Sequence, residues 1–176
     1  MAFVVISGLP GSGKTTLGRT LAARLGLAFI DKDDILERLF ASRGGGDAEW
    51  RRALSRDSDA LLQSEAMAST GAVIVSHWHS PGMAANSGTP AEWLKALTGK
   101  TVHVRCVCDA KIAAERFARR QRHPGHLDAA RSDADILASI EALTALPPLD
   151  LTPMIDVDTS GEVVAEEVLR LLRPWC

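Results

Sequence analysis

Short apolar runs alternate with longer segments of mixed polarity along the whole chain. Five of these runs have the length and β-branched content typical of buried strands, at residues 3–6, 28–31, 72–76, 101–107 and 153–157. A helix-compatible segment separates each run from the next. This alternation predicts an α/β domain in which helices cover both faces of a mostly parallel five-stranded sheet. Open sheets of this kind bind ligands at the carboxyl ends of their strands, so functional residues are expected just after each strand.

The segment at residues 47–69 predicts one long amphipathic helix. Its expected apolar stripe contains three leucines, Leu54, Leu61 and Leu62. Segments rich in glycine or proline, at residues 42–46 and 80–90, interrupt the strand–helix pattern and predict loops. Because nothing in the sequence resembles an interdomain linker or an internal repeat, we expect residues 1–176 to fold as a single domain.

The composition argues against several classes of protein. The 20 Lys and Arg residues nearly balance the 22 Asp and Glu residues, giving a net charge of -2, which disfavours binding to DNA or membranes through bulk electrostatics. The three cysteines fit neither a disulfide framework nor a metal site. The chain starts without a basic leader and has no apolar run of membrane-spanning length. We therefore expect a cytoplasmic protein with no membrane partner, no extended nucleic-acid contact and an oligomeric state that the sequence does not reveal.

A phosphate-binding motif follows the first strand. Residues 8–15, GLPGSGKT, match the pattern G-x-x-x-x-G-K-[ST] and lead into an amphipathic helix at residues 14–25. In such a loop the backbone N–H groups and the helix N-terminus bind phosphates, Lys14 reaches the β- and γ-phosphates, and the Thr15 hydroxyl binds magnesium. The motif predicts ATP and Mg²⁺ as cofactors. The expected nucleotide contacts are Gly8, Pro10, Gly11, Ser12, Gly13, Lys14, Thr15 and Thr16.

Other P-loop classes lack support in the sequence. A GTPase would carry an Asn-Lys-x-Asp stretch for base recognition, which is absent, and the single D-x-x-G match, at residues 158–161, follows the last predicted strand. Motor ATPases usually carry Asp-Glu after an apolar strand, and this chain contains no Asp-Glu pair. Phosphoryl transfer to a small acceptor is therefore the favoured class of reaction.

Two carboxylates, Asp31 and Asp33, come at the end of the second predicted strand. Transfer to an alcohol needs an anion that holds hydrated magnesium and a second group that orients the attacking hydroxyl. We expect Asp31 to hold the hydrated magnesium and Asp33 to orient the attacking hydroxyl. The alternative is that these acids only begin the helix at residues 35–40, and Asp34 is the expected N-cap.

Four arginines cluster in a later predicted helix, which Asp109 is expected to cap: Arg116, Arg119, Arg120 and Arg122. Like charges at this spacing repel one another unless an anion neutralises them, so the cluster predicts a small lid that brings arginine to the transferring phosphoryl group. Arg116 and Arg120 are the preferred catalytic pair, and the Pro124–Gly125 turn is expected to give the lid flexibility. A solvated basic face is the alternative.

The third predicted strand ends in Ser76-His77-Trp78-His79, where the two imidazoles alternate with an indole. The two histidine side chains are expected to face one side of the crevice and the tryptophan the other. His77 and Trp78 are candidate substrate contacts, and ordinary packing at the strand end is the alternative.

Taken together, these motifs resemble the small P-loop kinases related to shikimate kinase and gluconate kinase. The resemblance rests on the loop at residues 8–15, on FIDKD at residues 29–33 and on GDAEWRR at residues 46–52, which is similar to the start of their substrate-binding helix. It implies a three-layer P-loop NTPase fold with strand order 2-3-1-4-5, a water-mediated magnesium contact from Asp31, and a substrate contact from Arg51 or Arg52.

The resemblance also has departures. The sequence SHWHSP replaces the glycine triplet that follows the third strand of shikimate kinases, and residues 116–126 also resemble uncharacterised kinases of the chloramphenicol phosphotransferase type. The expected function is an ATP-dependent kinase that acts on a hydroxyl of a small metabolite or antibiotic. The alternatives are a nucleoside or nucleotide kinase, and an ATP-binding regulatory or RNA-end-handling protein.

Overall fold

The computed structural model describes residues 1–128 and 131–176, and it contains one parallel sheet. The strands run in the order β2-β3-β1-β4-β5, which confirms both the five-stranded parallel sheet and its expected order. Their bounds are β1 (Ala2–Gly8), β2 (Ala28–Asp31), β3 (Ala72–Val75), β4 (Lys100–Val107) and β5 (Met154–Asp158).

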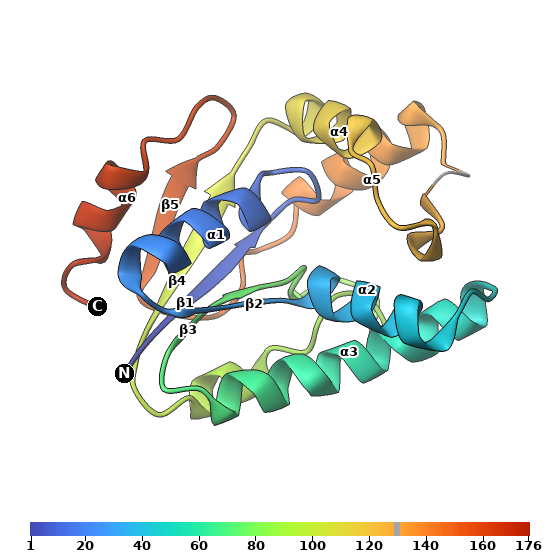
Figure 1. Ribbon diagram of the computed structural model, residues 1–176. Helices are drawn as coiled ribbons and strands as arrows, with labels where there is room; N and C mark the ends of the chain where they lie inside the picture. Colours follow the sequence, from blue (N-terminus) through green and yellow to red (C-terminus); the bar gives the residue numbers. More distant parts are fainter. Residues whose placement is uncertain (129–130) are drawn as a thin grey trace.

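Helices account for most of the chain between the strands (Figure 1). The α-helices are α1 (Lys14–Leu25), α2 (Lys32–Arg43), α3 (Ala48–Ala68), α4 (Ala110–Arg119), α5 (Asp133–Thr144) and α6 (Ala165–Leu172). Two short 3-10 helices are η1 (Glu92–Ala96) and η2 (Pro124–His126). Within the described ranges, no helix combines the length and the hydropathy that crossing a bilayer requires.

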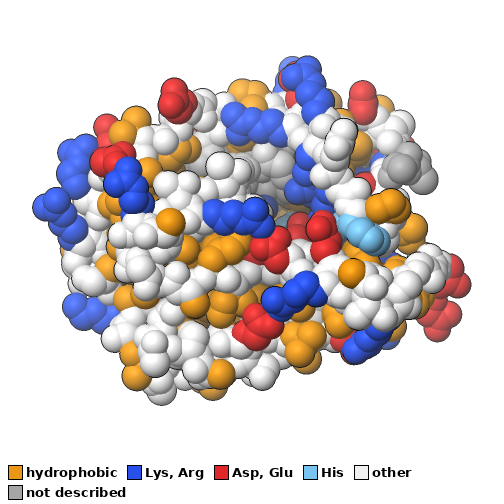
Figure 2. Space-filling view, in the orientation of Figure 1, with side chains coloured by type: hydrophobic (Ala, Val, Ile, Leu, Met, Phe, Trp, Pro, Cys, Tyr) orange, Lys and Arg blue, Asp and Glu red, His pale blue; other side chains and the backbone are white. Residues whose placement is uncertain are grey.

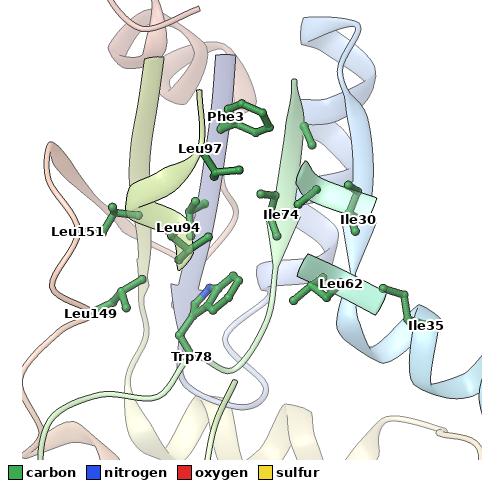
Figure 3. Close-up of a cluster of buried hydrophobic side chains, with 13 residues drawn as sticks. Phe3, Ile30, Ile35, Leu62, Ile74, Trp78, Leu94, Leu97, Leu149 and Leu151 are labelled. Atoms are coloured by element: carbon green, nitrogen blue, oxygen red, sulfur yellow. The ribbon is translucent and has the colours of Figure 1, made fainter. Parts of the chain in front are cut away.

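Two apolar layers enclose the sheet. One layer packs α1 and α6 against Val4 and Ile6 of β1. The other packs α3, η1 and the segment before β5 against Phe3 and Val5, and Figure 3 shows this cluster around Trp78. Because successive strand residues point to opposite faces and both faces are covered, the whole run at residues 3–6 is buried. This double burial explains why the sequence shows a continuous apolar run.

The predicted long helix is confirmed as α3. Asp47 is its N-cap, since its side chain accepts hydrogen bonds from the N–H groups of Glu49 and Trp50. Leu54 and Leu62 are buried in its apolar stripe, but the inclusion of Leu61 was wrong, because 39% of that residue is exposed. One position along a helix rotates a side chain by about 100°, which turns Leu61 away from the face that contains Leu62.

The start of α2 differs from the sequence-based expectation. Asp31 is the N-cap, and its Oδ1 accepts a hydrogen bond from the Asp33 N–H at 2.9 Å. The helix therefore begins at Lys32, directly after β2, and the prediction of Asp34 as the cap was wrong. Asp34 lies in the first turn and pairs with Arg19 at the surface. The strand passes into the helix without a loop, so the first carboxylate after the strand takes the capping position.

The arginine helix is shorter than expected. Asp109 does cap α4, as predicted, but the helix ends at Arg119. Arg120 and Arg122 therefore lie in an extended segment, and placing them within the helix was wrong. The turn that follows is packed and not open: a Cβ on Gly125 would lie 2.8 Å from ring atoms of Phe40. We refer to residues 120–128 as the lid segment.

Candidate active site

The loop between β1 and α1 has the curvature that phosphate binding requires. Gly11 and Gly13 have φ values of 79° and 85°, in the left-handed region that favours glycine. A Cβ on Gly11 would lie 2.1 Å from the Ala113 carbonyl oxygen, so α4 can approach the loop only because this residue is glycine. The loop is thus held between α1 and α4, with the N-terminus of α1 at its base.

Two side chains of this loop have unusual surroundings. Lys14 Nζ donates hydrogen bonds to the carbonyl oxygens of Gly8 at 3.0 Å and Leu9 at 2.7 Å, and burial lowers the pKa of this lysine despite nearby acidic groups. Ser12 Oγ is fully buried and has no hydrogen-bond partner among the described residues. A buried hydroxyl without a partner is costly, and a phosphate oxygen would satisfy it. The residues present therefore fit a nucleoside triphosphate.

Thr15 and Asp31 form an oxygen-rich corner next to the loop. Thr15 Oγ1 donates a hydrogen bond to Asp31 Oδ2 at 2.8 Å. Asp31 is only 3% exposed, and burial raises its pKa to about 6. A hydroxyl and a carboxylate are the hard oxygen ligands that magnesium takes, usually together with water and phosphate. These two residues fit the metal that the motif predicts.

Asp33 lies in a different electrostatic environment from Asp31. Its Oδ2 accepts a hydrogen bond from Arg122 Nη2 at 2.5 Å, and Arg122 also donates to Asp128 at 2.8 Å. Burial favours a higher pKa for Asp33, but Arg122 and three further basic side chains, His126, Arg120 and Lys14, outweigh this effect and lower the pKa. The two carboxylates therefore ionise in different pH ranges: Asp33 ionises below the usual range of an aspartate, and Asp31 ionises only as the pH rises through about 6.

The two preferred arginines are separated in the structure. Arg116 donates hydrogen bonds to the carbonyl oxygens of Thr159 at 2.6 Å and Ser160 at 2.7 Å, which ties α4 to the loop after β5. Arg120 lies over the Phe117 ring, with its guanidinium carbon 4.5 Å from the ring centroid, and Asp33 and Asp31 are among the charged groups that shift its pKa. Arg120 therefore lies within electrostatic range of the two carboxylates, whereas Arg116 binds backbone oxygens.

Sequence reasoning did not single out Arg122 as the partner of Asp33. A signal was present in Pro124, because proline disfavours helical backbone at the residue before it and a helix usually ends upstream. Both Arg120 and Arg122 contribute positive charge at Asp33.

The lid segment is docked on α2 and α3 through an aromatic clasp, which we define as Phe40, Trp50, His123 and His126. The Phe40 ring stacks against Trp50 and His123, with centroids 5.3 and 5.2 Å away, and meets His126 edge-on at 5.1 Å. Arg51 Nε donates to the His126 carbonyl oxygen at 3.2 Å. Of the two arginines expected to meet a substrate, Arg51 thus contacts the lid segment.

Arg52, the other candidate on this helix, is exposed. The three aromatic residues after β3 have separate surroundings. Trp78 is buried, and its Nε1–H donates to the Ile6 carbonyl oxygen at 2.8 Å. Burial lowers the pKa of His77 to about 4, and the charge of Lys14 lowers it further, whereas His79 is hydrogen-bonded to the Ser87 carbonyl oxygen in the adjoining loop. His77 is therefore neutral near pH 7, while Trp78 packs in the core cluster; both residues also line a cavity beside the loop.

Figure 2 shows acidic and basic side chains gathered around a hollow on one face of the molecule. Such a mixture of charges suits a ligand that carries both phosphates and a metal ion. The hollow lies on the carboxyl side of the sheet, where open α/β sheets bind their ligands.

Known proteins are similar to this chain in sequence and in fold. The AAA domain family matches residues 3–143. The shikimate kinase of Synechococcus sp. (strain CC9605) is 30% identical over 173 residues, which cover 94% of this chain and 79% of that protein. The alignments with the shikimate kinases of Corynebacterium glutamicum and Paracidovorax citrulli cover less than half of those proteins, 44% and 43%.

Solved structures agree with these sequence matches. A kinase-like protein from Chloroflexus aurantiacus superposes with a TM-score of 0.76 at 27% identity, covering 99% of this chain and 98% of that one. The shikimate kinase from Acinetobacter baumannii in complex with shikimate shares the fold, with a TM-score of 0.64 at 21% identity over 99% of this chain and 94% of that one. The chain therefore belongs to the AAA domain family and groups there with the small P-loop kinases related to shikimate kinase.

Proposed function

We propose that this protein is a kinase that transfers the γ-phosphoryl group of ATP to a hydroxyl of a small molecule. One observation carries the proposal: an oxygen pair suited to magnesium, Thr15 and Asp31, and a separate, readily ionised carboxylate, Asp33, lie together around the loop lysine Lys14. Phosphoryl transfer needs these parts, since catalysis in this class is mainly positioning and charge stabilisation.

Each residue has a role in the proposed reaction. Lys14 binds the β- and γ-phosphates, and Thr15 and Asp31 hold the magnesium ion. When bound, magnesium supplies positive charge to the phosphate oxygens. Asp33 accepts a hydrogen bond from the attacking hydroxyl and takes its proton as the new oxygen–phosphorus bond forms and the bond to the leaving ADP oxygen breaks.

The arginines stabilise charge around this centre. Arg120 is the arginine best placed to stabilise the transferring phosphoryl group, because it already lies within electrostatic range of Asp31 and Asp33. Arg116 would have to leave its two carbonyl partners to take part in the same step. Arg122 favours the ionised form of Asp33 while the lid segment is docked.

The named relatives support a small-molecule acceptor over a nucleotide acceptor or an RNA end, because the three sequence relatives named above are shikimate kinases. A cytoplasmic location and the lack of extended nucleic-acid contact remain part of the proposal. The first rests on the three free cysteines and the second on the near-neutral charge of the chain.

The test is ATP consumption with magnesium, screened across sugars, sugar acids, nucleosides, aminocyclitols and simple alcohols. We expect acceptor-dependent formation of ADP and a phosphate monoester, and the Lys14→Ala variant should form neither. Acceptor-independent ATP hydrolysis with every compound would contradict the proposal. Mass spectrometry of the product identifies the hydroxyl that receives the phosphoryl group.

A further inference from the structure

A cavity of about 290 Å³ lies beside the phosphate-binding loop. Ser7 and Trp78 line it, which places it on the face of the sheet that carries Phe3 and Val5 and not on the face of α1. This volume is close to the lower end of the range for small-molecule pockets, roughly 300–1,000 Å³. The cavity is thus large enough for one small organic molecule.

This cavity adjoins the proposed chemistry. Gly8 and Leu9, whose carbonyl oxygens accept hydrogen bonds from Lys14, also line the cavity. His77 lines it as well and lies close enough to Lys14 and Asp33 for both charges to shift its pKa. A molecule in the cavity would therefore lie beside the loop whose carbonyl oxygens accept hydrogen bonds from Lys14, while Lys14 itself is not part of the cavity wall.

No unpaired cation is available in the cavity wall that the structure describes. Arg105 is its one arginine or lysine, and it pairs with Asp156 through two hydrogen bonds. His77 has a pKa of about 4, and burial raises the pKa of the Cys106 thiol to about 11, so both are neutral near pH 7. A carboxylate placed there would lose its hydration without gaining a free ionic partner, which is costly.

The rest of the wall is mainly apolar. It includes Leu9, Trp78, Met83, Leu143, Leu146 and Pro147. Residues of this kind bind the carbon skeleton of a ligand and leave its orientation to a few polar groups. Among the polar groups of the wall, Ser7 has the most clearly defined hydrogen-bond orientation.

The orientation of the Ser7 hydroxyl follows from its partners. Ser7 Oγ lies 2.6 Å from His103 Nε2, and His103 Nδ1 lies 3.3 Å from the Leu151 carbonyl oxygen. A carbonyl can only accept, so Nδ1 carries the imidazole proton and Nε2 accepts the hydrogen bond from Ser7. His103 is fully buried and its pKa is lowered to about 4 by burial, which keeps this arrangement intact at neutral pH. Ser7 thus donates its hydroxyl proton to His103, and the lone pairs of Ser7 Oγ can accept a hydrogen bond from a ligand in the cavity.

We infer that this cavity is the acceptor pocket, that it takes an uncharged alcohol with an apolar body, and that Ser7 accepts a hydrogen bond from a donor group of that alcohol. The inference rests on the proposed function, because a molecule bound in this cavity is a phosphoryl acceptor only if the protein is a kinase. The chemical class differs from shikimate, which carries a carboxylate and is the ligand in the Acinetobacter baumannii complex.

Binding to the full chain tests the charge preference. The probes are matched pairs of alcohol and acid, benzyl alcohol with benzoate and 2-phenylethanol with phenylacetate, together with shikimate and its methyl ester, measured by ligand-observed NMR near neutral pH. We expect each uncharged member to bind at least about ten-fold more tightly than its acid. A non-hydrolysable ATP analogue should leave this binding in place. Equal or tighter binding of the acids, no binding of any uncharged probe, or displacement by the analogue would each overturn the inference.

A second pair of probes isolates the role of Ser7. In the wild-type chain, 2-phenylethanol should bind more tightly than its methyl ether, which cannot donate a hydrogen bond. The Ser7→Ala variant should lose this preference, because alcohol affinity falls by about three- to ten-fold while ether affinity stays the same. Ser80→Ala is the matched control, because Ser80 also lines the cavity but is not hydrogen-bonded to a histidine. No alcohol preference in the wild type, or an equal loss for both probes in Ser7→Ala, would show that the Ser7–His103 pair only supports the fold.

Turnover separates the two proposals. If uncharged alcohols bind but are never phosphorylated by ATP with magnesium, the pocket inference holds for binding and the kinase proposal fails. If acids are phosphorylated and uncharged alcohols do not bind, the kinase proposal holds and the inference is wrong.

Discussion

Replacing Asp31 by asparagine should make the metal-free protein more stable at neutral pH while impairing magnesium-dependent turnover. Asp31 is 3% exposed, and its pKa rises from 3.8 to about 6 mainly because burial disfavours the charged form. Above pH 6 the folded chain must therefore hold an ionised carboxylate that it accommodates poorly. Asparagine avoids this cost, is a good N-cap, and can still accept the hydrogen bond from the Asp33 N–H.

The magnitude follows from proton linkage. Each pKa unit corresponds to about 1.4 kcal/mol, so ionised Asp31 costs up to about 3 kcal/mol of folding free energy. Because the folded pKa is the higher one, the folded state binds the proton more tightly, and this contribution to stability is lost as the pH rises through about 6. The stability difference between Asp31→Asn and the wild type should grow by about 2 kcal/mol between roughly pH 4.5 and pH 8.

Urea unfolding of both proteins without magnesium, at about pH 4.5 and pH 8, measures this difference. Asp34→Asn is the matched control: Asp34 is exposed and paired with Arg19 at the surface, so the same substitution there should give no comparable gain. A stability difference that does not change with pH, or a variant less stable than the wild type at pH 8, would refute the reasoning. The magnesium concentration that gives half-maximal turnover should rise in Asp31→Asn, because a neutral amide binds the ion more weakly than a carboxylate.

Three further substitutions test the site. Lys14→Ala should reduce turnover with magnesium–ATP far more than it reduces stability, because among the described residues Lys14 Nζ hydrogen-bonds only to two loop carbonyls; kinetics and urea unfolding together show whether this holds. Asp33→Asn should keep nucleotide affinity, measured by calorimetry, and lose acceptor-dependent turnover, since an amide cannot take the proton of the hydroxyl. Arg122→Ala should speed amide hydrogen exchange in the lid segment, because it removes the link to Asp33 on α2. The matching change Arg119→Ala removes only an exposed pair within α4 and should leave that exchange as it is.

Most of the fold could be predicted because its signals are local. The apolar run at residues 3–6 is typical of a strand buried on both faces, and β1 is such a strand. Asp47 and Asp109 precede long helical segments and cap α3 and α4. The prediction was wrong where two signals competed, as at the start of α2, where Asp31, Asp33 and Asp34 all suit a first turn and the end of the strand decides which one caps.

The site could be predicted only in part, for a physical reason. The residues of the phosphate-binding loop are contiguous, so their spacing alone indicates their chemistry. By contrast, Ser7 and His103 are 96 positions apart, and Arg122 reaches Asp33 across 89 positions. Such contacts depend on strand register and on the path of the lid segment, neither of which leaves a local pattern. The sequence around His103 carries no motif, and the hydrogen bond between His103 and Ser7 forms only because β1 and β4 pair in this register.

The contrast between the two halves of the site sets the strength of acceptor binding that we expect. The half around Lys14 and Asp33 concentrates charge, which the transfer step requires, whereas the cavity offers an apolar wall and one oriented hydroxyl. An alcohol that buries about 200 Å² of apolar surface there would gain about 5 kcal/mol, at roughly 25 cal/mol per Å². That free energy corresponds to a Kd of about 0.2 mM before any ordering cost is counted. Acceptor affinity in this protein should therefore be modest, and a screen for its substrate needs millimolar concentrations of uncharged alcohols.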